Sequence, residues 1–299
     1  MDSCYQDFRS QPEIDAQYDT SLSVPHEAAE LQRYVDRAAQ ARASLRCHLD
    51  VPYGPSAAET LDIFPADEPG APVFVFIHGG YWRSSSSKDF SGVALGLQPL
   101  GITTVVIDYA LCPAVTLDEI TRQARAALAW VVRHIGEYGG DAARVAVGGH
   151  SAGAHLAAMC LLSHAGGIAA GAPAPLAAGL LVSGLYELEP LRRSYLQPVL
   201  RLDDGIVARN SPASAEVPRC TTPLWITWGG DETAEFARQS AAFHAAWQAA
   251  GNPSRLSALP GTHHFSAIHG FEEPGSELCQ WLADRLGPGS HRAISGDRS

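Results

Sequence analysis

The sequence has little positive charge for its length. Its 299 residues include 21 Lys and Arg against 32 Asp and Glu, which gives a formal net charge of −11. The basic residues form no cluster anywhere along the chain. Because nucleic acids and anionic membranes are bound mainly through clustered basic side chains, we expect neither as a partner.

The sequence also lacks cysteines at the spacing of a metal site. Six cysteines lie far apart, at positions 4, 47, 112, 160, 220 and 279, with no C-x-x-C pair. Zinc sites need closely spaced Cys or His ligands, so no metal is expected. Dispersed cysteines are typical of free thiols in a reducing compartment, and the N-terminus has no positive-then-apolar secretion signal. These absences predict a cytoplasmic location.

No apolar run is long enough to span a membrane as a helix. The longest weakly polar stretch, residues 165–185, is broken by several glycines and prolines. Short apolar or β-branched runs instead alternate with longer segments of helical period, a pattern typical of a mostly parallel sheet covered on both faces. The eight runs expected as strands are 48–51, 60–64, 73–77, 103–107, 144–148, 178–182, 224–228 and 255–259.

The segments between these runs predict the packing helices and the organisation of the chain. Helical periods cover residues 117–138, 151–162, 233–250 and 274–286. The length suits one α/β domain over residues 1–286. Within it we expect a polar N-terminal helical extension at 1–46 and a proline-containing, cap-like insertion at 186–218. Residues 287–299, rich in Gly, Ser and charge, are expected to form a flexible tail.

A His-Gly-Gly turn directly follows the apolar run 73–77. Glycines leave backbone N–H groups unobstructed, so Gly79, Gly80 and Tyr81 could point such groups at a developing negative oxygen. Glycine pairs also close strands without any chemical role, because glycine tolerates a positive φ. The turn alone leaves both interpretations open.

A Gly-x-Ser-x-Gly sequence around Ser151 follows the expected strand 144–148 and precedes an apolar helix. This context predicts a nucleophile elbow, a strained turn that lifts the serine above the end of the sheet. The helix that follows aims its N-terminus at the same point, so the Ala152 N–H would complete an oxyanion hole. A dinucleotide-binding turn is the competing interpretation, but the sequence there lacks G-x-G-x-x-G.

A serine hydroxyl needs a base, and the base needs a carboxylate to orient it. In a strand-elbow-helix arrangement of this kind the acid follows the serine in the chain and the histidine comes last. Two acids follow the expected strand 224–228: the spacing from Gly229 selects Glu232, and the spacing from Trp228 selects Asp231. We favour Glu232 as the triad acid and keep Asp231 as the alternative.

Two neighbouring histidines follow the last expected strand. We select His264 as the base because it directly precedes the aromatic Phe265, whose ring can fix the loop while the imidazole faces Ser151. His263 would then be a solvated or supporting neighbour. This chemistry requires neither a metal nor a cofactor.

Several segments carry a resemblance to a known family. They are Asp-Ala-Gln-Tyr at 15–18, Val-Pro-Tyr-Gly-Pro at 51–55, Glu-Thr-Leu-Asp-Ile-Phe at 59–64, His-Gly-Gly-Tyr-Trp-Arg at 78–83, the segment 108–117 that begins with Asp-Tyr, the elbow at Ser151, Ser-Gly-Leu-Tyr at 183–186 with the segment 188–196, Glu-Phe at 235–236 and Arg-Gln-Ser at 238–240. On these segments the chain resembles the serine-hydrolase type of kynurenine formamidase (arylformamidase) in the α/β-hydrolase superfamily. Aligned through the Glu-Phe pair at 235–236, the family's catalytic acid falls on Glu232, where an aspartate is often expected.

The resemblance implies an α/β-hydrolase fold, commonly assembled as a homodimer, that converts N-formyl-L-kynurenine to L-kynurenine and formate in tryptophan catabolism. A formyl-serine intermediate on Ser151 would form and then be hydrolysed. Tyr81 and Trp82 would be walls for the aromatic leaving group. Arg83 would bind the carboxylate of the amino acid, with Lys88, Arg192 and Arg193 as further candidate cations.

Two other interpretations remain open. The same residues serve acyl transfer in general, so the alternative is a carboxylesterase or an amide or carbamate hydrolase that acts on small aryl esters or amides. A more remote alternative is a non-catalytic, ligand-binding member of the fold.

Overall fold

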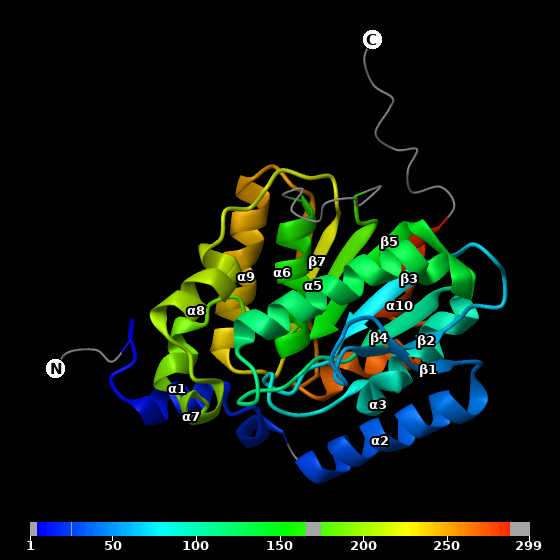
Figure 1. The fold of residues 1–299 in the computed structure, drawn as a ribbon. Coiled ribbons are helices and arrows are strands. Elements are labelled where there is room, and N and C mark those ends of the chain that lie inside the picture. The colour runs from blue at the N-terminus through cyan, green and yellow to red at the C-terminus, as the bar shows by residue number, and fades with distance from the viewer. Residues whose placement is uncertain (1–4, 25, 166–174, 288–299) are drawn as a thin grey trace.

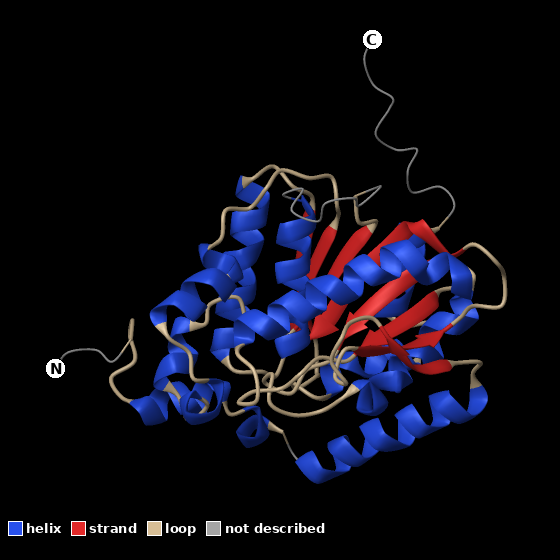
Figure 2. Ribbon diagram, viewed as in Figure 1, coloured by secondary structure: helices blue, strands red, loops and turns tan. Residues whose placement is uncertain are grey.

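The structure is a computed structural model that describes residues 5–24, 26–165 and 175–287. Apart from Gly287, the predicted C-terminal tail lies outside the described residues. Eight strands form one sheet in the order β1-β2-β4-β3-β5-β6-β7-β8 (Figures 1 and 2). The strands are β1 (His48–Pro52), β2 (Thr60–Phe64), β3 (Ala71–Ile77), β4 (Thr103–Ile107), β5 (Gly140–His150), β6 (Ala178–Val182), β7 (Leu224–Gly229) and β8 (Ser254–Leu259).

Only the first two strand pairings, β1 with β2 and β2 with β4, are antiparallel, and the other five are parallel. This arrangement confirms the predicted mostly parallel sheet of eight strands. The central strands β3, β4 and β6 are buried almost throughout. A strand that is covered on both faces consists of a continuous apolar run. This explains why the strand ranges predicted from the sequence agree closely with those in the structure.

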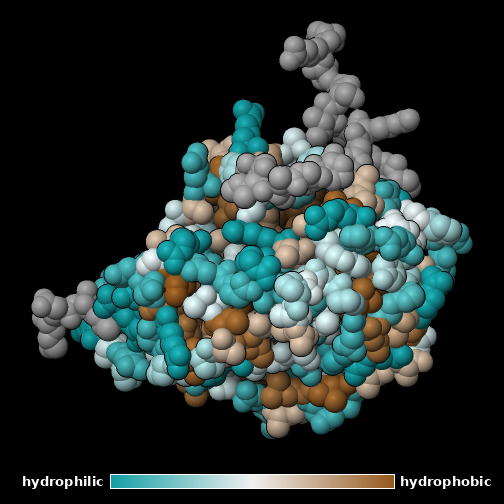
Figure 3. Space-filling model, viewed as in Figure 1, coloured by the Kyte–Doolittle hydropathy of each residue, from teal (hydrophilic) through white to brown (hydrophobic). Residues whose placement is uncertain are grey.

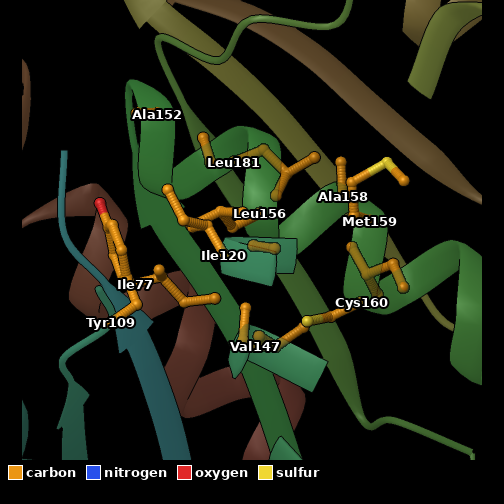
Figure 4. Close-up of a cluster of buried hydrophobic side chains, with 14 of the residues drawn as sticks. Ile77, Tyr109, Ile120, Val147, Ala152, Leu156, Ala158, Met159, Cys160 and Leu181 are labelled. Atoms are coloured by element: carbon orange, nitrogen blue, oxygen red, sulfur yellow. The ribbon is translucent and has the colours of Figure 1, made fainter. Parts of the chain in front are cut away.

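Helices cover both faces of the sheet (Figure 2). The described helices are α1 (Gln11–Tyr18), α2 (Glu27–Ser44), α3 (Ser87–Phe90), α4 (Ala94–Leu97), α5 (Leu117–His134), α6 (Ala152–Ala165), α7 (Gln197–Leu200), α8 (Asp204–Asn210), α9 (Ala234–Ala249) and α10 (Glu277–Leu286). On one face, residues of α5, α6 and α9 share a hydrophobic core with the sheet, part of which is drawn in Figure 4. Residues of α2, α4 and α10 pack in a second core.

The segments expected as an N-terminal extension and as a cap contact each other. The backbone N–H of Tyr195 donates to the Asp15 carboxylate of α1 over 2.7 Å, and Figure 1 draws α1 beside α7. Helix α2 belongs to the second core and packs on α3. Just after α3, Ser91 accepts a hydrogen bond from Arg42 over 3.0 Å. The division of the chain into one domain with an extension and a cap stays a prediction.

The surface drawn in Figure 3 is largely hydrophilic, with hydrophobic residues scattered over it. Among the described residues, the large hydrophobic side chains with the greatest exposure are Leu22, Leu31, Val35 and Leu49. Within the same residues, none of the helices combines the length and the apolar character that crossing a membrane would demand.

Candidate active site

Ser151 sits in the turn between β5 and α6, with a backbone φ of +55°. A serine seldom adopts this left-handed conformation, so the neighbouring structure must hold it there. Its N–H donates to the Val182 carbonyl of β6 over 2.9 Å. The flanking glycines are sterically required, because a Cβ on Gly149 would lie 2.6 Å and one on Gly153 1.9 Å from the Ile77 carbonyl oxygen. The strained strand-turn-helix expected from the sequence is present.

His264 and Glu232 meet in a buried side-chain hydrogen bond. The distance from His264 Nδ1 to Glu232 Oε2 is 2.7 Å, and the two side chains are 6% and 1% exposed. The second carboxylate oxygen, Oε1, accepts the Gly229 N–H over 2.6 Å and the hydroxyl of Ser183. Because the carboxylate occupies Nδ1, Nε2 is the ring nitrogen left for a serine hydroxyl. Ser151 and His264 line the same pocket.

The other two candidates of the sequence analysis lie elsewhere. Asp231 is exposed, its backbone N–H donates to the Thr262 carbonyl over 2.9 Å, and its carboxylate has no hydrogen-bond partner within the described ranges. His263 turns toward α2, with Nε2 3.4 Å from Glu30 Oε1. The structure therefore brings together Glu232 and His264, the pair that the sequence favoured.

The His-Gly-Gly turn lies directly against the elbow. A Cβ on Gly79 would approach Ser151 Cβ to 3.2 Å, and Gly80 has a φ of +106°, where a Cβ would lie 2.3 Å from the Ser84 carbonyl oxygen. Tyr81 also has a positive φ, of +48°. Ala152 is the first residue of α6, so its N–H has no acceptor inside the helix. The turn and the helix N-terminus therefore flank the serine from two sides.

A buried network beneath the turn was missed by the sequence analysis. His78 is fully buried, and its ring stacks on Tyr109 with centroids 4.3 Å apart. The Tyr109 hydroxyl donates to the His78 carbonyl over 2.8 Å, and Asp108 Oδ1 lies 3.5 Å from His78 Nε2. Burial alone would raise the pKa of Asp108, but the neighbouring His78 and the hydrogen bonds of Ser87 lower it. The Asp-Tyr pair directly after the run 103–107 was the available signal.

Three of the four candidate cations are engaged in ion pairs away from the pocket. Lys88 Nζ lies 2.7 Å from the fully buried Asp62 and 2.9 Å from Asp50. Arg192 and Arg193 pair with Glu189 at 3.0 and 3.2 Å. None of the three lines the pocket around Ser151.

Arg83 is the candidate cation that does line this pocket. It is exposed, and its guanidinium lies over the ring of Tyr195 at 5.6 Å from the centroid. Arg83 therefore adds a positive charge to the lining of this pocket, next to an aromatic ring.

The pocket has a volume of about 250 Å³. Aromatic side chains of Tyr34, Phe90 and Phe265 line it together with Tyr81, whose hydroxyl donates to the Tyr18 carbonyl. The N-terminal segment adds Asp19–Ser21, Glu27 and Leu31 to the wall. The sequence analysis expected only a helical extension there and missed this contribution, since nothing in the segment itself signals a site.

Trp82 does not line the pocket, so its expected role as a wall is corrected. The side chain is fully buried, and its ring meets His155 edge-on with centroids 4.9 Å apart. Trp82 follows Tyr81 in a left-handed conformation, with a φ of +55°, and belongs to the core that α6 shares with the sheet. Tyr81 faces the pocket, whereas Trp82 supports the turn from the core side.

The described residues contain no group of three or more His, Cys, Asp or Glu side chains that could hold a metal ion. What the arrangement can do is acyl transfer. A serine on a strained elbow, a buried carboxylate-histidine pair and a glycine turn next to a helix N-terminus form the pattern of a serine hydrolase.

Known proteins resemble the chain in sequence and in structure. Residues 61–168 match the family model BD-FAE. The kynurenine formamidase of Danio rerio is 27% identical over 93% of this chain and 97% of its own length. Esterase LipQ of Mycobacterium tuberculosis is 30% identical over 81% of this chain and 60% of its own length.

A solved structure from Silicibacter sp. tm1040, described as a thioesterase, superposes with a TM-score of 0.79 at 26% identity and covers 90% of this chain and 98% of its own. Esterase LipW of Mycobacterium marinum superposes with a TM-score of 0.68 at 22% identity and covers 87% and 89% of the two chains. The resemblance noted in the sequence is confirmed: the chain is a hydrolase of the α/β-hydrolase superfamily and is related to the kynurenine formamidases.

Proposed function

We propose that this hydrolase cleaves an aryl formamide, N-formyl-L-kynurenine, into L-kynurenine and formate. The observation that carries the chemistry is the buried 2.7 Å contact between His264 and Glu232, at the pocket that Ser151 also lines. The substrate is supported by the kynurenine formamidase of Danio rerio, which the chain matches over 97% of that protein's length.

In the first half of the reaction, Ser151 Oγ attacks the formyl carbon while His264 Nε2 takes its proton. Glu232 holds the Nδ1–H and stabilises the imidazolium that forms. Negative charge develops on the formyl oxygen, which N–H groups of Gly79, Gly80 or Tyr81 and of Ala152 would bind.

His264 then gives the proton to the arylamine nitrogen, the C–N bond breaks, and L-kynurenine leaves. The formyl group remains as an ester on Ser151. In the second half, His264 removes a proton from a water molecule, which attacks the ester carbon. The hydroxyl of Ser151 is restored and formate departs.

The size and lining of the pocket support a small aromatic substrate. Its volume of about 250 Å³ is slightly below the range of about 300–1,000 Å³ typical of drug-sized ligands. Tyr81 would face the aryl ring and Arg83 would pair with the α-carboxylate at the mouth of the pocket. The five free cysteines among the described residues support action in the cytoplasm.

Esterase relatives favour a second candidate, a carboxylesterase acting on small aryl esters. The test compares kcat/KM for N-formyl-L-kynurenine with that for p-nitrophenyl acetate, using Ser151→Ala as the inactive control. We expect the formamide to be the better substrate. We also expect Arg83→Leu to raise KM about tenfold for the formamide alone, the effect of losing one charge-assisted pair. A far higher kcat/KM for the ester would refute the formamidase assignment.

A further inference from the structure

His150 lies immediately before the proposed nucleophile and has no part in the proposed chemistry. The residue is 4% exposed and lines the pocket. Its Nε2 lies 2.8 Å from the main-chain oxygen of His264. A carbonyl oxygen can only accept, so Nε2 carries the hydrogen, and Nδ1 is the bare nitrogen of a neutral ring.

The surroundings keep this ring neutral. Burial lowers the pKa of His150 well below its usual range, and the nearby charges of His264 and His269 act in the same direction, while the hydrogen bond to the His264 carbonyl opposes them. A neutral His150 does not repel the imidazolium that His264 becomes during turnover. Its lone pair also stays out of proton transfer, because Nδ1 is fully enclosed.

The opposite edge of the ring reaches the oxyanion turn. In the described part of the chain, Nδ1 has no hydrogen-bond partner, and a Cβ added to Gly79 would lie 3.2 Å from it. The rings of His150 and His264 are 4.6 Å apart between centroids, inclined at 45°. One rigid side chain therefore fills the space between the elbow, the glycine turn and the histidine loop.

We propose that His150 is a positioning residue, which holds the His264 loop and the Gly79 turn at their working distance from Ser151. The proposal rests on the function proposed above. Without the Nε2–H, the His264 carbonyl loses its donor, and the loop is free to shift relative to the serine. A displacement of about 1 Å in a catalytic group can lower turnover about a hundredfold.

The experiment uses His150→Leu and His150→Gln in the full chain. The readouts are the rate constant for labelling of Ser151 by a fluorophosphonate, kcat and KM. We expect His150→Leu to lower the labelling rate and kcat between about tenfold and about a hundredfold, with KM changed less than about threefold. Glutamine keeps an N–H donor near the position of Nε2, so His150→Gln should retain most of both rates.

Thr222→Val is the matched control for the loss of a buried donor to a main-chain carbonyl. Thr222 is buried just before β7, and its hydroxyl donates to the Leu176 carbonyl over 3.0 Å. It does not line the pocket. We expect Thr222→Val to lower Tm, as His150→Leu does, while the labelling rate stays within about threefold of wild type.

Three outcomes would overturn the positioning role. They are normal labelling of His150→Leu, an equal loss of labelling in Thr222→Val, and a well-folded His150→Gln that labels as slowly as the leucine variant. A wild-type chain that is not labelled at Ser151 would instead refute the proposed function, and this proposal with it.

Discussion

Replacing Glu232 by glutamine tests the acid of the proposed triad. The hydrogen bonds of the Glu232 carboxylate determine how the new amide group must be oriented. Oε1 accepts from the Gly229 N–H and the Ser183 hydroxyl, whereas Oε2 faces His264 Nδ1. In Glu232→Gln the amide oxygen keeps the two donors, so the NH₂ group must face Nδ1. Nδ1 then has to act as an acceptor, and the ring proton moves to Nε2.

That tautomer cannot take the proton of Ser151. The corresponding exchange of carboxylate for amide in a serine protease triad lowers kcat about 10⁴-fold. We expect a loss of the same order here, about 5.5 kcal/mol in the activation free energy at about 1.4 kcal/mol per tenfold. KM should change little, because the substrate does not contact Glu232 in the proposed mechanism.

The assay measures kcat and KM for N-formyl-L-kynurenine together with Tm, with Asp231→Asn as the matched control. Asp231 is exposed and its carboxylate has no partner among the described residues, so its exchange should leave kcat within about twofold. A Glu232→Gln variant with more than about a tenth of wild-type kcat would refute the tautomer argument. A large loss in Asp231→Asn alone would move the acid to that residue.

Two further predictions concern the oxyanion turn and the pH dependence of stability. Gly80→Ala places a Cβ 2.3 Å from the Ser84 carbonyl oxygen at a φ of +106°, so the turn must shift, and kcat should fall about a hundredfold while circular dichroism still reports a folded chain. Burial lowers the pKa of His155 to about 4. The His155 ring therefore binds a second proton below about pH 6.5 in the unfolded chain, but only below about pH 4 in the folded chain. The contribution of neutral His155 to the free energy of unfolding is fully present above pH 6.5, and about 3 kcal/mol of it is lost as the pH falls to 4. In urea unfolding, His155→Gln should therefore show a smaller decrease in the free energy of unfolding between pH 6.5 and pH 4. An unchanged decrease would contradict the buried, neutral state of His155.

The strands could be predicted because a strand that is buried on both faces of the sheet consists mostly of consecutive apolar residues. Strand β5 extends to Gly140, several residues before the expected run 144–148, because Gly140 pairs with Ala71 at the start of β3 before the register shifts. Pairing of this kind depends on a neighbouring strand and leaves no local pattern. The start of a strand that depends on such pairing therefore cannot be predicted from the sequence.

The candidate site divides in the same way. The elbow at Ser151 could be predicted because a strained turn needs glycines at fixed positions, and the parallel strands place the acid and histidine loops at the same edge. The sequence could not predict that Tyr81 lines the pocket while Trp82 is buried in the core. The two residues are neighbours in one turn, and only the side chains that pack on each of them decide which way it points. Trp82 turns into the core because His155 of α6 receives its ring, a contact between residues far apart in the chain.

The histidine loop is held from two sides, and this makes the N-terminal segment part of the site. His150 bonds the carbonyl of His264 from the elbow. From α2, the hydroxyl of Tyr34 donates to the carbonyl of the next residue, Phe265, over 2.6 Å. The Tyr18 carbonyl of α1 likewise accepts from Tyr81 in the oxyanion turn. Because both loops are tied to helices that precede the first strand, removing those helices would loosen the geometry around the serine and open the wall of the pocket.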